Sequence, residues 1–108
     1  MRVRRDFLAA NAGKRVATPG FVLLVHPRGD DDPDMRVGFT VSRKVGNAVT
    51  RNRMKRRLRE LARKLLPDHG TPGADHVIIG RQRGVERDFS KLENELRGAL
   101  DTLAGKAA

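Results

Sequence analysis

Three kinds of side chain in this sequence could take part in phosphate or proton chemistry: three histidines, an acidic cluster and a dense run of cations. His26 follows an apolar run, His69 lies in a segment rich in Pro and Gly, and His76 opens another apolar run. Self-sufficient phosphodiester cleavage needs a His pair acting as acid and base, or convergent carboxylates that hold metal ions. Because the histidines stand apart, we interpret each as structural or solvated and predict no catalytic residue.

The acidic cluster consists of Asp30, Asp31, Asp32 and Asp34. Carboxylates can hold a hard cation, but this spacing lacks the glycine and the distal glutamate of an EF-hand loop. We therefore predict a solvated turn and no metal site. The sequence also has no Gly-rich phosphate loop or nucleophile elbow, and without cysteine it has no Cys-based zinc site.

The cations gather between Arg43 and Lys64, where ten Lys or Arg face a single acid, Glu60. This segment carries +9 (ten minus one) of the formal net charge of +10. Like charges four residues apart on a helix repel one another, and a merely solvated face would mix both signs. The segment therefore predicts a polyanionic partner, with nucleic acid first and an anionic membrane surface as the rival.

A membrane helix and a bZIP basic region fit the segment less well. A membrane-surface helix would carry Trp, Phe or Leu over a broad apolar face, and a bZIP region would continue into a heptad zipper that Pro67 prevents here. RNA or DNA bound through phosphates remains. Arg51 and Arg53 offer forked donors, and Asn52 offers an amide that can read a base or a 2′-hydroxyl.

Strands must position this segment. The run from Phe21 to Val25 is apolar at every position, as in a buried central strand. The run from Met35 to Val41 alternates, which predicts one covered and one open face. Because a turn separates the two runs, we predict that they form a hairpin. A third strand is predicted over residues 76–79, closed by Gly80.

Helical spacing marks three further segments. A short helix is predicted with Asp6 as its N-cap and Gly13 as its end, and a closing helix is predicted from Ser90, which forms a capping box with Glu93. The basic helix is predicted to begin near Asn47 and to end by Pro67. Its apolar stripe is Met54, Leu58, Leu61 and Leu65, flanked by two cationic shoulders: Arg51, Lys55, Arg59 and Arg63 on one side, and Arg53, Arg57 and Lys64 on the other.

Length and composition indicate one domain spanning residues 1–108. The absence of cysteine, of a signal-peptide pattern and of any apolar run of membrane-spanning length predicts a cytoplasmic protein without a membrane partner. Arg81, Arg83 and Arg87 form a second, looser basic patch.

The residues from Lys44 to Glu60 make the pattern specific. This pattern closely resembles the RNR signature of the bacterial ribonuclease P protein subunit. It consists of Lys44-Val45-Gly46-Asn47-Ala48-Val49, followed by Arg51-Asn52-Arg53, Lys55-Arg56 and Arg59-Glu60. The resemblance extends to Arg5-Asp6-Phe7, to residues 36–42 and 75–81, and to the leucine-rich closing helix.

The resemblance implies an α+β fold, a small two-layer α/β sandwich similar to domain 2 of ribosomal protein S5, with element order αβββαβα. It adds a short first strand near residues 15–18, and it implies that the motif helix forms a left-handed βαβ crossover, against the usual handedness.

The function implied by the resemblance is that of an RNA-binding subunit of ribonuclease P. Such a subunit joins a catalytic RNA, expected at one protein per RNA, whose bound Mg²⁺ ions remove the 5′ leader from precursor tRNA. The protein alone is expected to bind no cofactor. Two alternatives remain open: a ribosomal-protein-like RNA-binding component with no role in cleavage, and a self-sufficient basic nuclease.

The resemblance also implies the site residues, position by position. The predicted RNA-binding residues are Arg43, Lys44, Asn47, Arg51, Asn52, Arg53, Lys55, Arg56, Arg59 and Arg63. The predicted leader cleft comprises Phe7, Asn11, Leu24, Arg51 and Asn52. Phe7 matches an aromatic of that cleft, although it could equally anchor the core. Asn11 and Leu24 stand where relatives often have aromatics, so we predict weak selectivity for leader bases.

Overall fold

The computed structural model describes residues 14–29 and 31–104. A single four-stranded sheet consists of β1 (Lys14–Ala17), β2 (Phe21–Pro27), β3 (Arg36–Val41) and β4 (Ala74–Gly80), arranged in the order β1-β2-β4-β3. The helices are α2 (Ala48–His69) and α3 (Phe89–Leu103), with short 3-10 turns at Arg43–Val45 and Gln82–Gly84. The short helix predicted between Asp6 and Gly13 lies outside the described residues.

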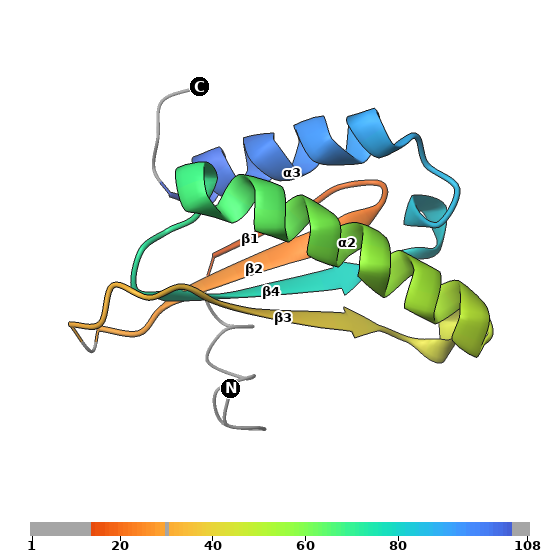
Figure 1. Cartoon of the computed structure of the whole chain (residues 1–108), viewed down its shortest axis with the longest axis horizontal. Coiled ribbons are helices and arrows are strands. Elements are labelled where there is room, and N and C mark those ends of the chain that lie inside the picture. The colour runs from red at the N-terminus through yellow and green to blue at the C-terminus, as the bar shows by residue number, and fades with distance from the viewer. Residues whose placement is uncertain (1–13, 30, 105–108) are drawn as a thin grey trace.

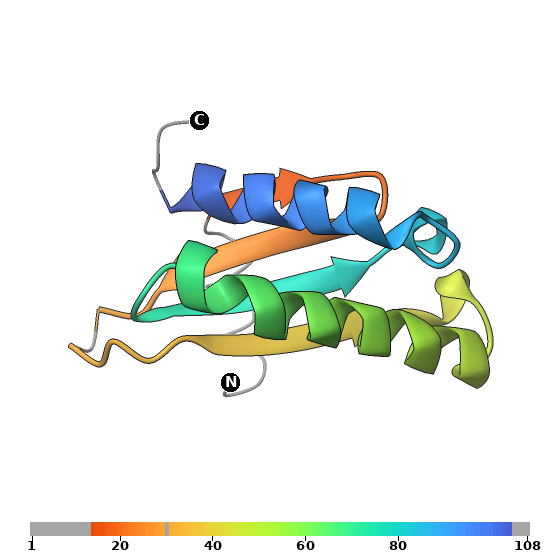
Figure 2. The same ribbon diagram turned by 45° about the horizontal axis from the view of Figure 1, so that its top comes forward.

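The two helices lie side by side on one face of the sheet (Figures 1 and 2). Helix α2 packs over β3 and β4, whereas α3 packs over β1 and β2. The α+β class and the two-layer arrangement are therefore confirmed. The first strand, which only the family resemblance supplied, is also confirmed within one residue of its expected position.

The predicted hairpin between the second and third strands is wrong. Strand β4 lies between them, so that Ile78 is opposite Leu23 of β2 on one side and opposite Phe39 of β3 on the other. The central place goes to β4 because it is buried along nearly its whole length, whereas the alternating strand β3 is suited to an edge.

Strands β3 and β4 are parallel neighbours joined by α2. With α2 in front of the sheet and both strands pointing to the right, β4 lies above β3, which makes the crossover left-handed (Figure 1). The great majority of βαβ units are right-handed. Periodicity does not predict this reversal, and here only the family resemblance did.

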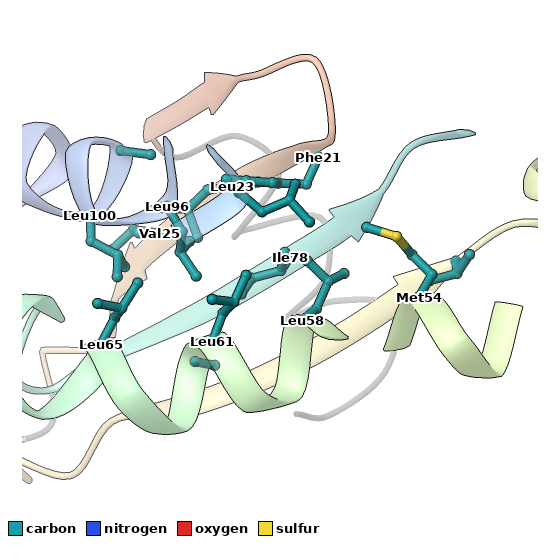
Figure 3. Packing of buried hydrophobic residues seen from close by; sticks show 14 of the residues in the cluster. Phe21, Leu23, Val25, Met54, Leu58, Leu61, Leu65, Ile78, Leu96 and Leu100 are labelled. Atoms are coloured by element: carbon teal, nitrogen blue, oxygen red, sulfur yellow. The ribbon is translucent and has the colours of Figure 1, made fainter. Parts of the chain in front are cut away.

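One apolar core lies between the sheet and the helices. The predicted stripe of α2 points into it, with Met54, Leu58 and Leu61 all fully buried (Figure 3). Leu65, the last member of the stripe, is 3% exposed, and the labelled side chains outside α2 come from the strands and from α3: Phe21, Leu23, Val25, Ile78, Leu96 and Leu100. Burial of this stripe fixes the rotation of α2, and thereby fixes which of its cations face outward.

The ends of the helices differ in part from the predictions. Asn47 caps α2 as predicted, because its side-chain oxygen accepts a hydrogen bond from the backbone N–H of Thr50 at 2.9 Å. However, α2 continues past Pro67 to His69. Pro67 lies in the last turn and is exposed, so the carbonyl that loses its usual donor can face water.

The capping box predicted for α3 is wrong. The N-cap is Asp88, whose carboxylate accepts from the backbone N–H of Ser90. Glu93 does not reach back to the helix start and instead bonds Lys64 of α2 and Arg97 of its own helix. A capping box and a tertiary ion pair compete for the same carboxylate, and the sequence alone does not reveal the partner from α2.

Candidate nucleic-acid interface

The entry to α2 is built around Gly46. Its φ of 156° lies at the limit of the positive region, and a Cβ there would come within 2.9 Å of the Thr50 side chain. Glycine therefore allows the chain to turn from the 3-10 segment into the N-cap at Asn47. Arg43 and Lys44 are exposed in that segment, directly before the helix.

The cations of one shoulder of α2, Arg53, Arg57 and Lys64, make contacts within the protein. Arg57 donates hydrogen bonds to the backbone carbonyls of Gly84, Val85 and Arg87, and its guanidinium lies 5.7 Å from the ring centroid of Phe89. Burial is the main cause that lowers the pKa of Arg57. This side chain fastens α2 to the segment before α3 and is not placed for a ligand.

The other two members of this shoulder face acids. Lys64 pairs with Glu93 at 2.9 Å, and Arg53 lies 3.4 Å from Glu86. The Arg53 pair is highly exposed on both sides, so it is worth little and can exchange for a phosphate. Arg53 thus remains available, whereas Lys64 pairs at a shorter distance with a mostly buried carboxylate and Arg57 is bound within the fold.

The opposite shoulder is different. Among the residues that the structure describes, none of its four cations forms an ion pair with an acid, and neither does Arg56, which lies between the shoulders. The five cations concerned are Arg51, Lys55, Arg56, Arg59 and Arg63. We call these five residues the free cationic face. The Nε of Arg51 is buried without a hydrogen-bond partner. An uncompensated row of cations on a rigid helix suits a line of phosphates.

The predicted leader-cleft residues are only partly placed. Phe7 and Asn11 lie outside the described residues. Leu24 is 1% exposed and packs with Val77 and Ile79 on the sheet face opposite the helices. Arg51 and Asn52 lie in the first turns of α2, on the other side of the sheet. The described residues therefore do not bring these groups into one pocket, and the cleft stays a prediction.

Two of the three histidines have structural partners. His76 is fully buried, and its Nε2 accepts from the backbone N–H of Thr71 at 3.1 Å. Burial is the main cause that lowers the pKa of His76. His69 lies 2.8 Å from Asp101 of α3. These contacts tie His76 to the backbone before β4 and join His69 of α2 to α3.

The acidic turn is organised by an arginine. Arg28 donates to the backbone carbonyls of Asp32 and Asp34, at 3.1 Å and 2.7 Å, and it also pairs with the carboxylate of Asp75. Within residues 14–29 and 31–104, no group of three His, Cys, Asp or Glu side chains is placed to hold a metal ion.

Asp75 is an anchor that the sequence did not reveal. Its carboxylate is buried and accepts two hydrogen bonds from Arg36, at 2.6 Å and 2.8 Å, directly across the β3–β4 ladder. Burial opposes its ionisation, but the hydrogen bonds and charges of Arg36 and Arg28 outweigh that effect and lower its pKa. This cluster holds the edge strand β3 in register beside α2.

The fold also leaves a pocket that periodicity could not predict. It lies between β3 and α2, where Arg59 sits 5.9 Å from the ring centroid of Phe39. Separately, none of the helices in the described part of the chain is both long and apolar enough to cross a membrane.

Comparison with known proteins bears on the basic helix. The family model described as Ribonuclease P matches residues 1–104. The ribonuclease P protein component of Erythrobacter litoralis is 59% identical over 100 residues, which cover 93% of this chain and 81% of that protein. That of Caulobacter vibrioides is 43% identical over 104 residues, covering 96% of this chain and 70% of the relative.

Solved structures agree. The RNase P protein of Staphylococcus aureus superposes with a TM-score of 0.76 at 31% identity, covering 94% of this chain and 92% of that one. The RNase P protein of Thermotoga maritima gives 0.75 at 33% identity, with coverages of 100% and 97%. The motif, the left-handed crossover and these matches agree with one another, and the chain belongs to the family of bacterial ribonuclease P protein components.

Proposed function

We propose that this protein binds the catalytic RNA of ribonuclease P and the 5′ leader of precursor tRNA, and thereby assists removal of the leader in the bacterial cytoplasm. The observation that carries the proposal is the free cationic face of α2. Its five cations project from one rigid helix whose rotation is fixed by a buried stripe. Binding of phosphates along it would release counterions, which favours association at moderate salt.

In this proposal the protein positions RNA and the RNA performs the chemistry. Mg²⁺ ions held by the catalytic RNA would activate the water that cleaves the precursor. The described residues support this division, because the partners of His69 and His76 are structural and the acidic turn is held by Arg28. One protein per RNA follows from the family resemblance.

The leader would be held with little selectivity for its bases. Leu24, which the family resemblance assigns to the cleft, is aliphatic and almost fully buried, so it offers no aromatic face for stacking. Contacts with the leader would then depend mainly on charge and on the amide of Asn52.

A reconstitution assay tests the proposal. Cleavage of precursor tRNA is measured at low Mg²⁺ with protein alone, with catalytic RNA alone, and with both together. We expect cleavage to rise strongly only in the mixture. Cleavage by the protein alone would instead establish a self-sufficient nuclease, and a mixture no faster than the RNA alone would favour a ribosomal-protein-like component.

A further inference from the structure

The pocket between β3 and α2 combines an apolar floor with a cationic rim. Met35, Val37 and Phe39 line it from the strand side, and Ala62 and Leu66 line it from the helix. Its volume is about 300 Å³, at the lower end of the range for small-molecule sites. This is room for one planar ring system and not for a helix or an extended peptide.

The apolar floor is open to solvent at the edge of the sheet. In the described part of the chain, strand β3 is the last strand of the sheet and pairs with β4 alone, and Val37 keeps 38% of its surface exposed. Phe39 is only partly buried against the core. Exposed apolar side chains on an edge strand are usually avoided because they invite unwanted pairing, so their presence here favours a ligand.

The rim of the pocket belongs to the free cationic face. Arg59 and Arg63 both line the pocket, and neither forms an ion pair with an acid in the described part of the chain. The guanidinium of Arg59 lies 5.9 Å from the ring centroid of Phe39. Aromatic rings and guanidinium planes are the two surfaces on which unstacked bases pack, and the second cation is placed for a phosphate.

We propose that this pocket takes one unpaired nucleobase of the RNA that α2 binds, stacked against Phe39 and Arg59, with Arg63 contacting the adjoining phosphate. The inference rests on the proposed function, since it assigns a nucleotide subsite to the same RNA-binding helix. An apolar peptide would bury the same floor, but it would leave both rim cations without a counter-charge. A nucleotide satisfies floor and rim together.

The first test removes the aromatic face and keeps an apolar side chain. The substitution Phe39→Leu is compared with Phe89→Leu, a control because a guanidinium, that of Arg57, also lies over the Phe89 ring, at 5.7 Å, and Phe89 is 37% exposed. The probe is transcribed ribonuclease P RNA of Caulobacter vibrioides, the source of a relative. We expect Phe39→Leu to weaken binding about 5-fold or more without changing the salt dependence, because no charge is removed.

The outcomes separate this inference from the proposed function. Equal binding by the wild type and both variants would overturn the nucleobase subsite alone, and would leave the pocket to a protein partner. Failure of the wild-type protein to bind the RNA would overturn both proposals. Circular dichroism and urea unfolding establish that each variant is folded.

A second measurement does not depend on Phe39. The chain has no cysteine, so Val37→Cys creates a single thiol at the exposed edge of the pocket. An aryl azide attached to that thiol should crosslink the RNA at one unpaired nucleotide. The control is Lys91→Cys on the exposed face of α3, which should not label that nucleotide. Crosslinks from position 37 that are scattered, or that fall only in double helices, would overturn the subsite.

Discussion

The contrast between the two shoulders of α2 leads to a prediction about salt. Lys55→Gln with Arg56→Gln removes two cations of the free cationic face. The control, Lys64→Gln with Arg97→Gln, removes two cations that both bond Glu93. Each double variant lowers the formal net charge from +10 to +8 (ten minus two). Any difference between the variants therefore reports the location of the charge and not its amount.

The expected magnitude follows from counterion release. Each phosphate contact with RNA contributes about 0.7–0.9 to the slope of log K against log salt, so losing two contacts should reduce the slope by about 1.4–1.8. Raising the salt from 50 to 200 mM should weaken RNA binding in both proteins, but the factor by which the affinity falls should be about 7–12 times smaller for the variant than for the wild type. The control should keep a slope within about 0.3 of the wild type, because its cations neutralise a carboxylate.

The assay is filter binding or fluorescence anisotropy with labelled catalytic RNA at four or more salt concentrations. Equal slopes for the two double variants would refute the reasoning, since they would mean that proximity to Glu93 does not decide which cations meet phosphate. A larger reduction in the control would mean that the RNA lies against the side of α2 that faces α3.

Three further predictions concern stability, each measured by urea unfolding. Gly84→Ala should destabilise by about 1–3 kcal/mol, because its Cβ would lie 2.5 Å from a backbone oxygen, whereas Gly98→Ala should stabilise by about 0.5–1 kcal/mol, because it meets nothing within 4 Å and lies inside α3; the opposite order would contradict the packing. Burial lowers the pKa of His76, so the unfolded chain binds the proton at a higher pH than the folded chain does. The free energy of unfolding should therefore fall as pH drops below about 6.5. The variant His76→Gln should lose this pH dependence, and a slope as steep as that of the wild type would exclude His76 as its source. Asp75→Asn should lower the free energy of unfolding by about 2 kcal/mol at neutral pH, less than for a fully buried pair because Arg36 is half exposed. Because the pKa of Asp75 is lowered in the folded state, this loss of stability relative to the wild type should shrink as pH falls below about 4. A loss that does not depend on pH would mean that the shape of the side chain matters there and not its charge.

Local patterns predicted the elements better than their pairing. The spacing of Met54, Leu58 and Leu61 gave the buried face of α2, and Asn47 gave its start, because both depend on neighbours within one turn. The hairpin prediction failed because β4, which separates the two strands, comes about forty residues later in the sequence. Pairing over such distances depends on which strand is buried on both faces, and a short apolar run does not specify that alone.

The candidate site shows the same division. The sequence located the cations, but not which of them the fold retains, because the partners of Arg57 and Lys64 lie about thirty residues downstream. The pocket beneath Arg59 was missed for a similar reason. Its floor alternates in β3 like that of any half-buried strand, and only the position of α2 turns it into a cavity.

The cations of the free cationic face also destabilise the helix α2 that carries them. Arg51, Lys55, Arg59 and Arg63 form three successive like-charge pairs four residues apart, which together cost about 0.6–1.5 kcal/mol at low salt. The first turn holds no acid to balance the helix dipole. Added salt should therefore raise the free energy of unfolding of the protein alone and lower its affinity for RNA. A bound polyanion would supply the negative charge that offsets the repulsion between the cations of α2.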